Sequence, residues 1–247
     1  MKWAVVLLFA AMAVYVRVSL PMLMDMRGNE PDPTVGERVT REVAIEAIDI
    51  HLICFGEWGT QSAAQMEAGR YVPRGAAGYV MQEGERFCVI GAMYEDAAQA
   101  ERVCTQLGAA EGLSCSVKRN RAAEVRMRMT AREGQIEAFV QGEKTMRQTW
   151  RALGALSLAL DRGEANVQQA HAVLDGHLEK MRSARKALKD AGGTGQEIFG
   201  SLDVLLDALT SDLEEMTEER GRMALSAKLK YCGIDAALRQ AVWMNGM

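Results

Sequence analysis

Between residues 44 and 120, short β-type and helix-type segments follow one another in the order strand, helix, strand, strand, helix, strand. The β-type segments are rich in β-branched, aromatic and other apolar residues, whereas the helix-type segments are rich in alanine, glutamine and glutamate. The six segments cover residues 47–58, 60–72, 78–82, 86–94, 95–112 and 113–119. A chain with this order closes as a four-stranded antiparallel sheet with both helices on one face.

The residues between these segments favour the same interpretation. Gly84 lies between two glutamates in a connection short enough for a tight hairpin. Glu95 and Asp96 open the second helix-type segment, where negative charge is favourable at a helix N-terminus. Gly108 or Gly112 can end that helix.

Four stretches of this region resemble the SPOR domain, a peptidoglycan-binding module of bacterial cell division and sporulation proteins. They are ICFGEW (53–58), GAAGYV (75–80), ERFCVIGAMYEDAAQAERV (85–103) and LSCSVKR (113–119). The resemblance implies a ferredoxin-like βαββαβ module that is not an enzyme and lies outside the cytoplasmic membrane of a single-pass protein. It also implies that glycan strands bind to the sheet face opposite the helices.

The resemblance places Ile53, Phe55, Val89, Gly91 and Met93 toward the helices. Alternation along the strands then puts four residues on the open face. These candidate ligand-binding residues are Leu52, Cys54, Cys88 and Ile90. Because this face is more apolar than a sugar-binding surface, and an exposed apolar patch is unusual, we expect the C-terminal helices or a partner protein to cover it. Glycan binding would then be weak or lost.

The N-terminal residues 3–24 are almost wholly apolar apart from Arg17, and as a helix they would span about 33 Å, enough to cross a bilayer. We expect residues 1–24 to be a transmembrane signal anchor, with the bulk of the chain outside the cytoplasmic membrane. A signal peptide cleaved near Ala11–Ala13 is the alternative. Residues 25–43 contain two prolines, two glycines and many charges, and are typical of a linker.

Residues 121–247 contain no proline and are predicted to be helical throughout. An apolar residue recurs every seven positions, as in a coiled coil. The series is Phe139, Met146, Leu153, Leu160, Val167, Leu174, Met181 and Leu188. Breaks are expected at Gly163 and at AGGTG (191–195), and a last segment runs from about Arg222 to Trp243. We therefore expect an antiparallel helical hairpin or a small bundle, which either binds a partner protein or buries its own apolar stripe.

The cysteines and histidines do not indicate a cofactor, a metal or a catalytic centre. The chain has five cysteines, and their scattered spacing does not match a zinc or iron–sulfur motif. Cys54 and Cys88 are expected on adjacent strands, either as two buried thiols or as a disulfide. Three histidines, at 51, 171 and 177, accompany no recognisable catalytic motif.

Two functions follow for this α+β chain. In the first, a membrane-anchored protein binds peptidoglycan glycan strands during division or sporulation. In the second, a membrane-anchored assembly factor uses the SPOR-like module and the helical region to bind proteins. The formal net charge of -4 gives no electrostatic reason to expect nucleic acid.

Overall fold

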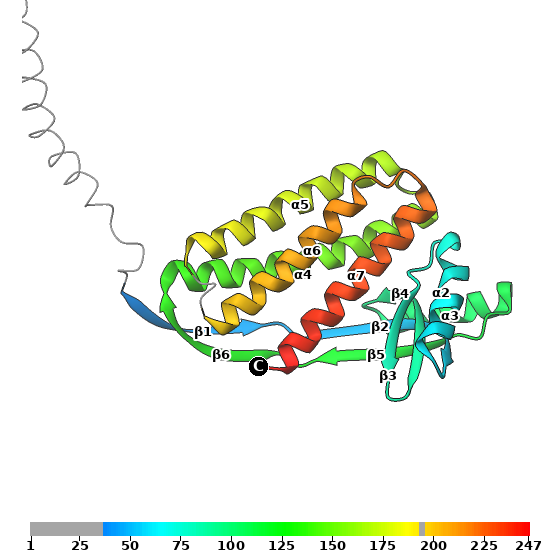
Figure 1. Ribbon diagram of the computed structural model, residues 1–247, viewed down its shortest axis with the longest axis horizontal. Coiled ribbons are helices and arrows are strands. Elements are labelled where there is room, and N and C mark those ends of the chain that lie inside the picture. Colours follow the sequence, from blue (N-terminus) through cyan, green and yellow to red (C-terminus); the bar gives the residue numbers. More distant parts are fainter. Residues whose placement is uncertain (1–36, 193–195) are drawn as a thin grey trace, which may run out of the picture. The chain divides into compact units, whose positions relative to one another are not determined.

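The computed structural model describes residues 37–192 and 196–247, in which it has an α+β architecture with two sheets and six α-helices (Figure 1). The strands are β1 (Arg38–Ile45), β2 (Ile48–Trp58), β3 (Tyr79–Glu83), β4 (Arg86–Tyr94), β5 (Ser116–Ala122) and β6 (Val125–Arg132). The α-helices are α2 (Gln61–Tyr71), α3 (Ala97–Glu111), α4 (Glu133–Arg162), α5 (Val167–Asp190), α6 (Glu197–Met216) and α7 (Arg222–Asn245), and η1 (Val72–Arg74) is a 3₁₀ turn. The predicted anchor, residues 1–24, and most of the predicted linker lie outside the described residues.

The predicted four-stranded sheet is present, with the strand order β3-β4-β2-β5 and antiparallel pairing throughout. Helices α2 and α3 pack on one face of it, where Ile53, Phe55 and Val89 form a small core with alanines of both helices. Local signals place the second helix as expected. The Asp96 carboxylate caps α3 by accepting from the backbone N–H of Gln99, and α3 ends at Gly112 with a φ of 65°.

A bulge in β4 corrects one detail of the predicted alternation. Ile53 pairs with Ala92 and Cys54 pairs with Ile90, which leaves Gly91 as the extra residue on β4. The bulge shifts the alternation by one residue, so Met93 packs against the core on the other face instead of facing α2 and α3. A Cβ at position 91 would lie 2.1 Å from Cζ of Phe55, so glycine is what allows the Phe55 ring to lie against this strand.

The largest departure from the sequence prediction is a strand pair formed by β1 and β6. The linker predicted over residues 25–43 contains β1 from Arg38 onward, and the helical region predicted over residues 121–247 begins with strands up to Arg132. The register continues from one sheet into the other: Ile45 pairs with Val125, and Ile48 pairs with Ala122. The pairs β1–β6 and β2–β5 therefore form one long antiparallel ribbon, which is interrupted only at residues 46–47 and 123–124.

The helical region forms a bundle of four consecutive antiparallel helices, α4 to α7 (Figure 1). Of the seven-residue series, Val167 is partly buried and the other seven members are fully buried in the main core. Gly163 ends α4 with a φ of 71°, and α5 and α6 are separated at the predicted turn. The small bundle is thus confirmed, and the series is the stripe with which the helices pack on one another and on the ribbon.

Of the two arrangements expected for Cys54 and Cys88, the structure has the buried thiols and not the disulfide. A disulfide joins Cys104 on α3 to Cys115 in the segment before β5, with their Cα atoms 5.8 Å apart. Cys54, Cys88 and Cys232 are free and buried. The disulfide holds the C-terminal half of α3 close to the start of the edge strand β5.

Candidate functional site

The four residues predicted to bind glycan do lie together on one sheet face, but helix α7 covers that face. Leu52, Cys54, Cys88 and Ile90 are at most 1% exposed and belong to the same core as residues of α4 and α7. Helix α7 packs against β3, β4 and β5. Of the two covers expected from the sequence, the C-terminal helices are therefore the one present, and the four side chains offer no surface to a ligand.

Polar contacts fix α7 to the edge of the module. The Lys230 ammonium donates to the carbonyl of Gly75 (2.5 Å), to the Asp161 carboxylate (2.5 Å) and to the Ser226 hydroxyl (3.1 Å). The Ser226 hydroxyl in turn donates to Asp161 (2.5 Å). Because Lys230 is a buried cation with all three donors engaged, this cluster ties α7 to both α4 and the turn after η1.

The same cluster contains a serine and a lysine, which could suggest nucleophilic catalysis. A serine nucleophile needs a neighbouring base that can accept its proton. Here the Lys230 ammonium is paired with a carboxylate, and the Ser226 side chain is fully buried. The geometry is that of a structural ion pair with a satisfied hydroxyl.

An apolar cavity of about 170 Å³ lies beside this cluster, on the side of the sheet that α2 and α3 cover. Its lining includes Phe55, Tyr71 and Tyr94, together with the Lys230–Asp161 pair. The volume is well below the few hundred cubic ångströms of an ordinary small-molecule site. It has room for one small apolar group.

A second charged cluster lies at the end of the sheet. The Glu57 and Glu83 carboxylates and the Cys88 sulfur lie within 4.8 Å of one another, an arrangement that could hold a metal ion. However, the Lys118 ammonium donates to Glu57 (2.7 Å) and to Glu83. These hydrogen bonds raise the pKa of Lys118, and burial, with a smaller effect of Cys54, raises the pKa of the Cys88 thiol to about 11. A metal ion would have to displace the Lys118 ammonium from both carboxylates. It would also have to bind the thiolate of Cys88, although the raised pKa of this thiol disfavours deprotonation.

The histidines are not brought together with one another. His51 lies beside Asp49 on β2 (3.9 Å), and His171 contacts Arg220 (3.2 Å). His177 contacts the hydroxyl of Thr149 (3.2 Å), and burial lowers its pKa. Within residues 37–192 and 196–247, none of the three has the acid and nucleophile partners of a catalytic triad.

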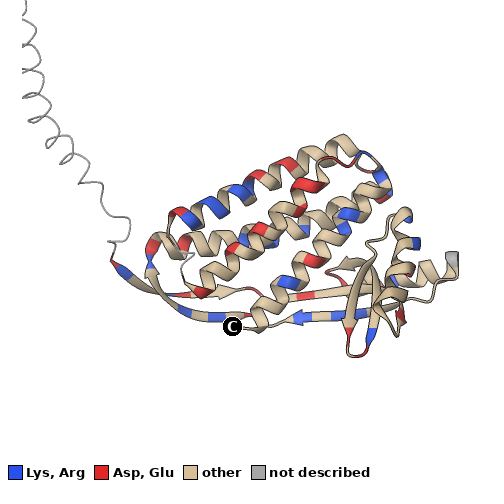
Figure 2. Ribbon diagram, in the orientation of Figure 1, with Lys and Arg blue, Asp and Glu red and all other residues tan. Residues whose placement is uncertain are grey.

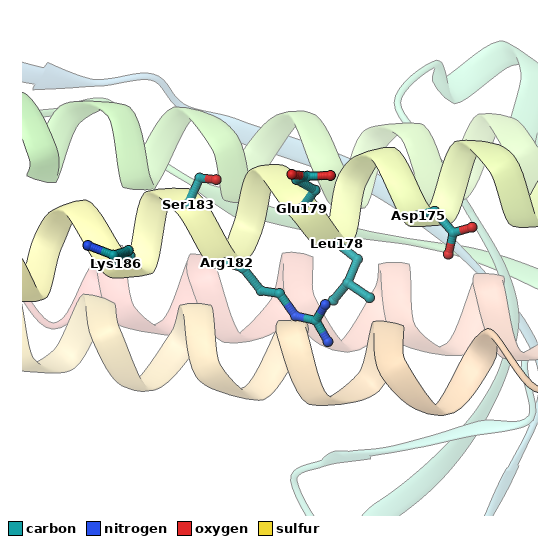
Figure 3. Close-up of a pocket in the computed structure, with 6 residues that line it drawn as sticks. All are labelled: Asp175, Leu178, Glu179, Arg182, Ser183 and Lys186. Atoms are coloured by element: carbon teal, nitrogen blue, oxygen red, sulfur yellow. The ribbon is translucent and has the colours of Figure 1, made fainter.

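A groove of about 480 Å³ runs along α5 (Figure 3). Its lining carries both signs of charge, from Asp175, Glu179, Arg182 and Lys186. Arg182 reaches across to α6, where it donates to Glu214 (2.6 Å). With mixed charges and an internal partner for its central arginine, the groove shows no preference for a ligand of one chemistry.

A larger groove, about 700 Å³, lies between the first three residues of β6 and the helices α6 and α7, has no β1 residue in its lining, and was not expected from the sequence. We call it the edge groove, and it is lined by Val125, Arg126, Met127, Glu197, Ile198, Ser201, Trp243, Gly246 and Met247. Strict alternation of apolar or small residues with polar ones in VRMRMTAR (125–132) was the available signal, because a period of two is typical of a half-buried strand.

Among the residues that the structure describes, no helix combines the length and the apolar character needed to cross a bilayer. Comparisons with protein families, with curated proteins and with solved structures found no match to this chain.

Proposed function

We propose that this chain is a membrane-anchored assembly factor that binds other proteins and has no enzymatic activity. In this proposal residues 1–24 are the anchor, the linker follows, and the bulk of the chain lies outside the cytoplasmic membrane. The strand order, with both module helices on one face, supports a ferredoxin-like βαββαβ module. With the four stretches named above, it supports a SPOR-type domain.

One observation favours protein binding over glycan binding, namely the burial of Leu52, Cys54, Cys88 and Ile90 beneath α7. A glycan could reach this face only if α7 left it. That movement would expose the apolar sheet face and the matching face of α7, and would break the buried contacts of Lys230. Each fully buried leucine or isoleucine side chain brought into water costs about 1.5–3 kcal/mol, so the covered state is strongly preferred.

Peptidoglycan sedimentation tests the proposal. The full-length chain in detergent is mixed with purified sacculi whose stem peptides have been removed, and an established glycan-binding SPOR domain serves as the positive control. We expect the chain to stay in the supernatant while the control sediments. Sedimentation of the chain at the level of the control would overturn the proposal and restore the glycan-binding alternative.

A role in division or in sporulation is proposed on the same resemblance. A fluorescent fusion to the C-terminus should gather at midcell or at the forespore. Uniform distribution around the cell through growth and sporulation would contradict both roles.

A further inference from the structure

The outer edge of β6 is an open strand edge beside a mainly apolar groove, whose lining also holds Arg126 and Glu197. The sheet formed by β1 and β6 has only these two strands, so on the side away from β1 the β6 backbone pairs with no strand of the described chain. Alternate backbone N–H and C=O groups of a strand point toward each neighbour. Half of those of β6 therefore point away from β1, where a further strand could bond to them, and the edge groove borders this side of the strand at residues 125–127.

The side walls of the edge groove suit the side chains of such a strand. Val125 and Met127 face the bundle side of β6, and Ile198, Trp243 and Met247 form the helical wall. The indole N–H of Trp243 donates to the Ser201 hydroxyl (2.9 Å), which holds the ring in place. A strand added to β6 would direct every second side chain between these apolar groups.

Charge on the opposite face of β6 restricts which strand fits. Arg128 and Arg126, the second of which also borders the groove, are exposed there along a run of basic residues on β5 and β6 (Figure 2). Arg126 pairs with Glu124, whereas Arg128 lies opposite Glu42 of β1 and has no ion pair among the described residues. Carboxylates beside these arginines would form favourable cross-strand pairs, and like charges would be destabilising.

The same arginines argue against a second copy of this chain as the occupant. If two β6 strands paired edge to edge, the arginines at alternate positions of one would face those of the other. Charged residues on an edge strand are a common device against such self-pairing.

We propose that the edge groove binds an extended segment of a partner protein in which acidic and apolar residues alternate. The segment adds to β6 as a third strand, its apolar side chains enter the groove, and its carboxylates lie beside Arg126 and Arg128. The inference rests on the proposed protein-binding function and specifies the chemistry of the partner.

Fluorescence anisotropy with designed peptides tests the inference on the full-length chain in detergent. The probe is a labelled ten-residue peptide alternating glutamate with valine. A second peptide carries lysine in place of glutamate, and a third carries proline in place of two valines, because proline cannot donate a strand hydrogen bond. We expect the glutamate peptide to bind at least about tenfold more tightly than either of the others, as expected for two cross-strand charge pairs.

Charge reversal gives the matched variant. Arg126→Glu combined with Arg128→Glu should lower the affinity of the chain for the glutamate peptide by about tenfold or more. The same variant should bind the lysine peptide more tightly than the glutamate peptide. Arg70→Glu combined with Arg102→Glu reverses two exposed arginines on α2 and α3 and should leave both affinities unchanged. On binding, hydrogen exchange should slow in β6.

The inference is overturned if none of the peptides binds, if the charge reversal leaves the preference unchanged, or if binding leaves exchange in β6 unaltered. If one of these peptide results is obtained and the chain also fails to sediment with sacculi, only the inference about β6 is overturned. The proposed function then still holds, because the sedimentation assay does not involve β6. Sedimentation with sacculi together with specific binding of the glutamate peptide would overturn the proposed function alone.

Discussion

The Arg147 guanidinium reaches from α4 to the backbone carbonyl of Glu46, with 2.7 Å between Nη2 and the oxygen. Its other terminal nitrogen donates to the carbonyl of Ala47 (3.1 Å). Glu46 and Ala47 form the interruption of the long ribbon between β1 and β2. The buried Arg147 side chain therefore donates hydrogen bonds to both backbone carbonyls of this interruption. Glu143 compensates the charge of Arg147 with bonds of 3.0 and 2.6 Å.

We expect Arg147→Met to lower the free energy of unfolding by about 3–5 kcal/mol, because it leaves the buried Glu143 carboxylate without its cation. Burial already raises the pKa of this carboxyl, despite the opposing effect of Arg147. Urea unfolding followed by circular dichroism measures the loss. Arg151→Met is the control, since Arg151 forms an exposed pair with Glu95 (2.9 Å) and should cost about 1 kcal/mol or less. Equal losses for the two variants would contradict this role of Arg147.

Gly91→Ala should destabilise the module by about 1–3 kcal/mol, because the new methyl group would collide with the Phe55 ring. Combining it with Phe55→Leu should recover part of the loss, and a double-mutant cycle on thermal unfolding measures the coupling. Gly176→Ala on α5 is the matched control, as a Cβ there meets nothing within 4 Å. That change should stabilise the helix by up to about 1 kcal/mol. Additive losses at positions 91 and 55 would show that the two residues are not in contact.

Reducing the Cys104–Cys115 disulfide should lower stability by about 3 kcal/mol, the chain-entropy value for a loop of this length. Thermal unfolding with and without a reductant measures the effect, and Cys104→Ser should reproduce it without a reductant. Peptide mapping under non-reducing conditions should find Cys104 linked to Cys115, with Cys54, Cys88 and Cys232 alkylated only after unfolding. An unchanged unfolding temperature on reduction would refute a stabilising role.

Asp212 on α6 should make stability depend on pH. Burial, with a further contribution from Asp235, raises its pKa above the ordinary value of 3.8. The folded state therefore holds this proton more tightly than the unfolded state. The stability that Asp212 contributes is present below pH 3.8 and is lost as pH rises through the folded pKa.

The variant Asp212→Asn removes this titration. Its stability relative to the original chain should rise with pH from about 4 upward and then level off. Urea unfolding at several pH values measures the difference, with Asp175→Asn on the exposed side of α5 as the control. Parallel pH profiles for the original chain and Asp212→Asn would rule out this linkage.

Local signals in the sequence were sufficient for the type and order of the module elements, although the last strand, predicted at residues 113–119, is observed as β5 at Ser116–Ala122. Strand β4 was predicted at residues 86–94, where it is observed, and the caps at Asp96 and Gly112 bound α3 as expected. The prediction was wrong for β1 and β6. Arg38 pairs with Arg132 and Ile45 pairs with Val125, and no local pattern reports a partner so distant in the sequence.

The polar appearance of these two strands explains why they were missed. Only one face of each strand is buried, so polar residues occupy every second position of β6 and several positions of β1. The alternation in β6 was a usable signal. In β1 it is weaker, since Arg41 lies on the side where a buried residue would be expected.

In the candidate site, too, the sequence predicted what depends on neighbouring residues but not what depends on contacts between distant segments. Alternation along β2 and β4 was enough to place Leu52, Cys54, Cys88 and Ile90 on one face, and their apolar character was enough to expect a cover. The edge groove could not be foreseen, because it is formed by β6, the start of α6 and the end of α7, which meet only in the folded chain.

By itself, the sequence determined the module elements, the helical stripe and the apolar character of one sheet face, because propensity, capping and periodicity act over a few residues. Only the tertiary structure decided that α7 covers this face, that β1 and β6 extend the sheet into a ribbon, and that Cys104 bonds to Cys115. These outcomes depend on which surfaces meet in the folded chain. Burial of apolar area stabilises any complementary pair of surfaces, regardless of their distance along the chain.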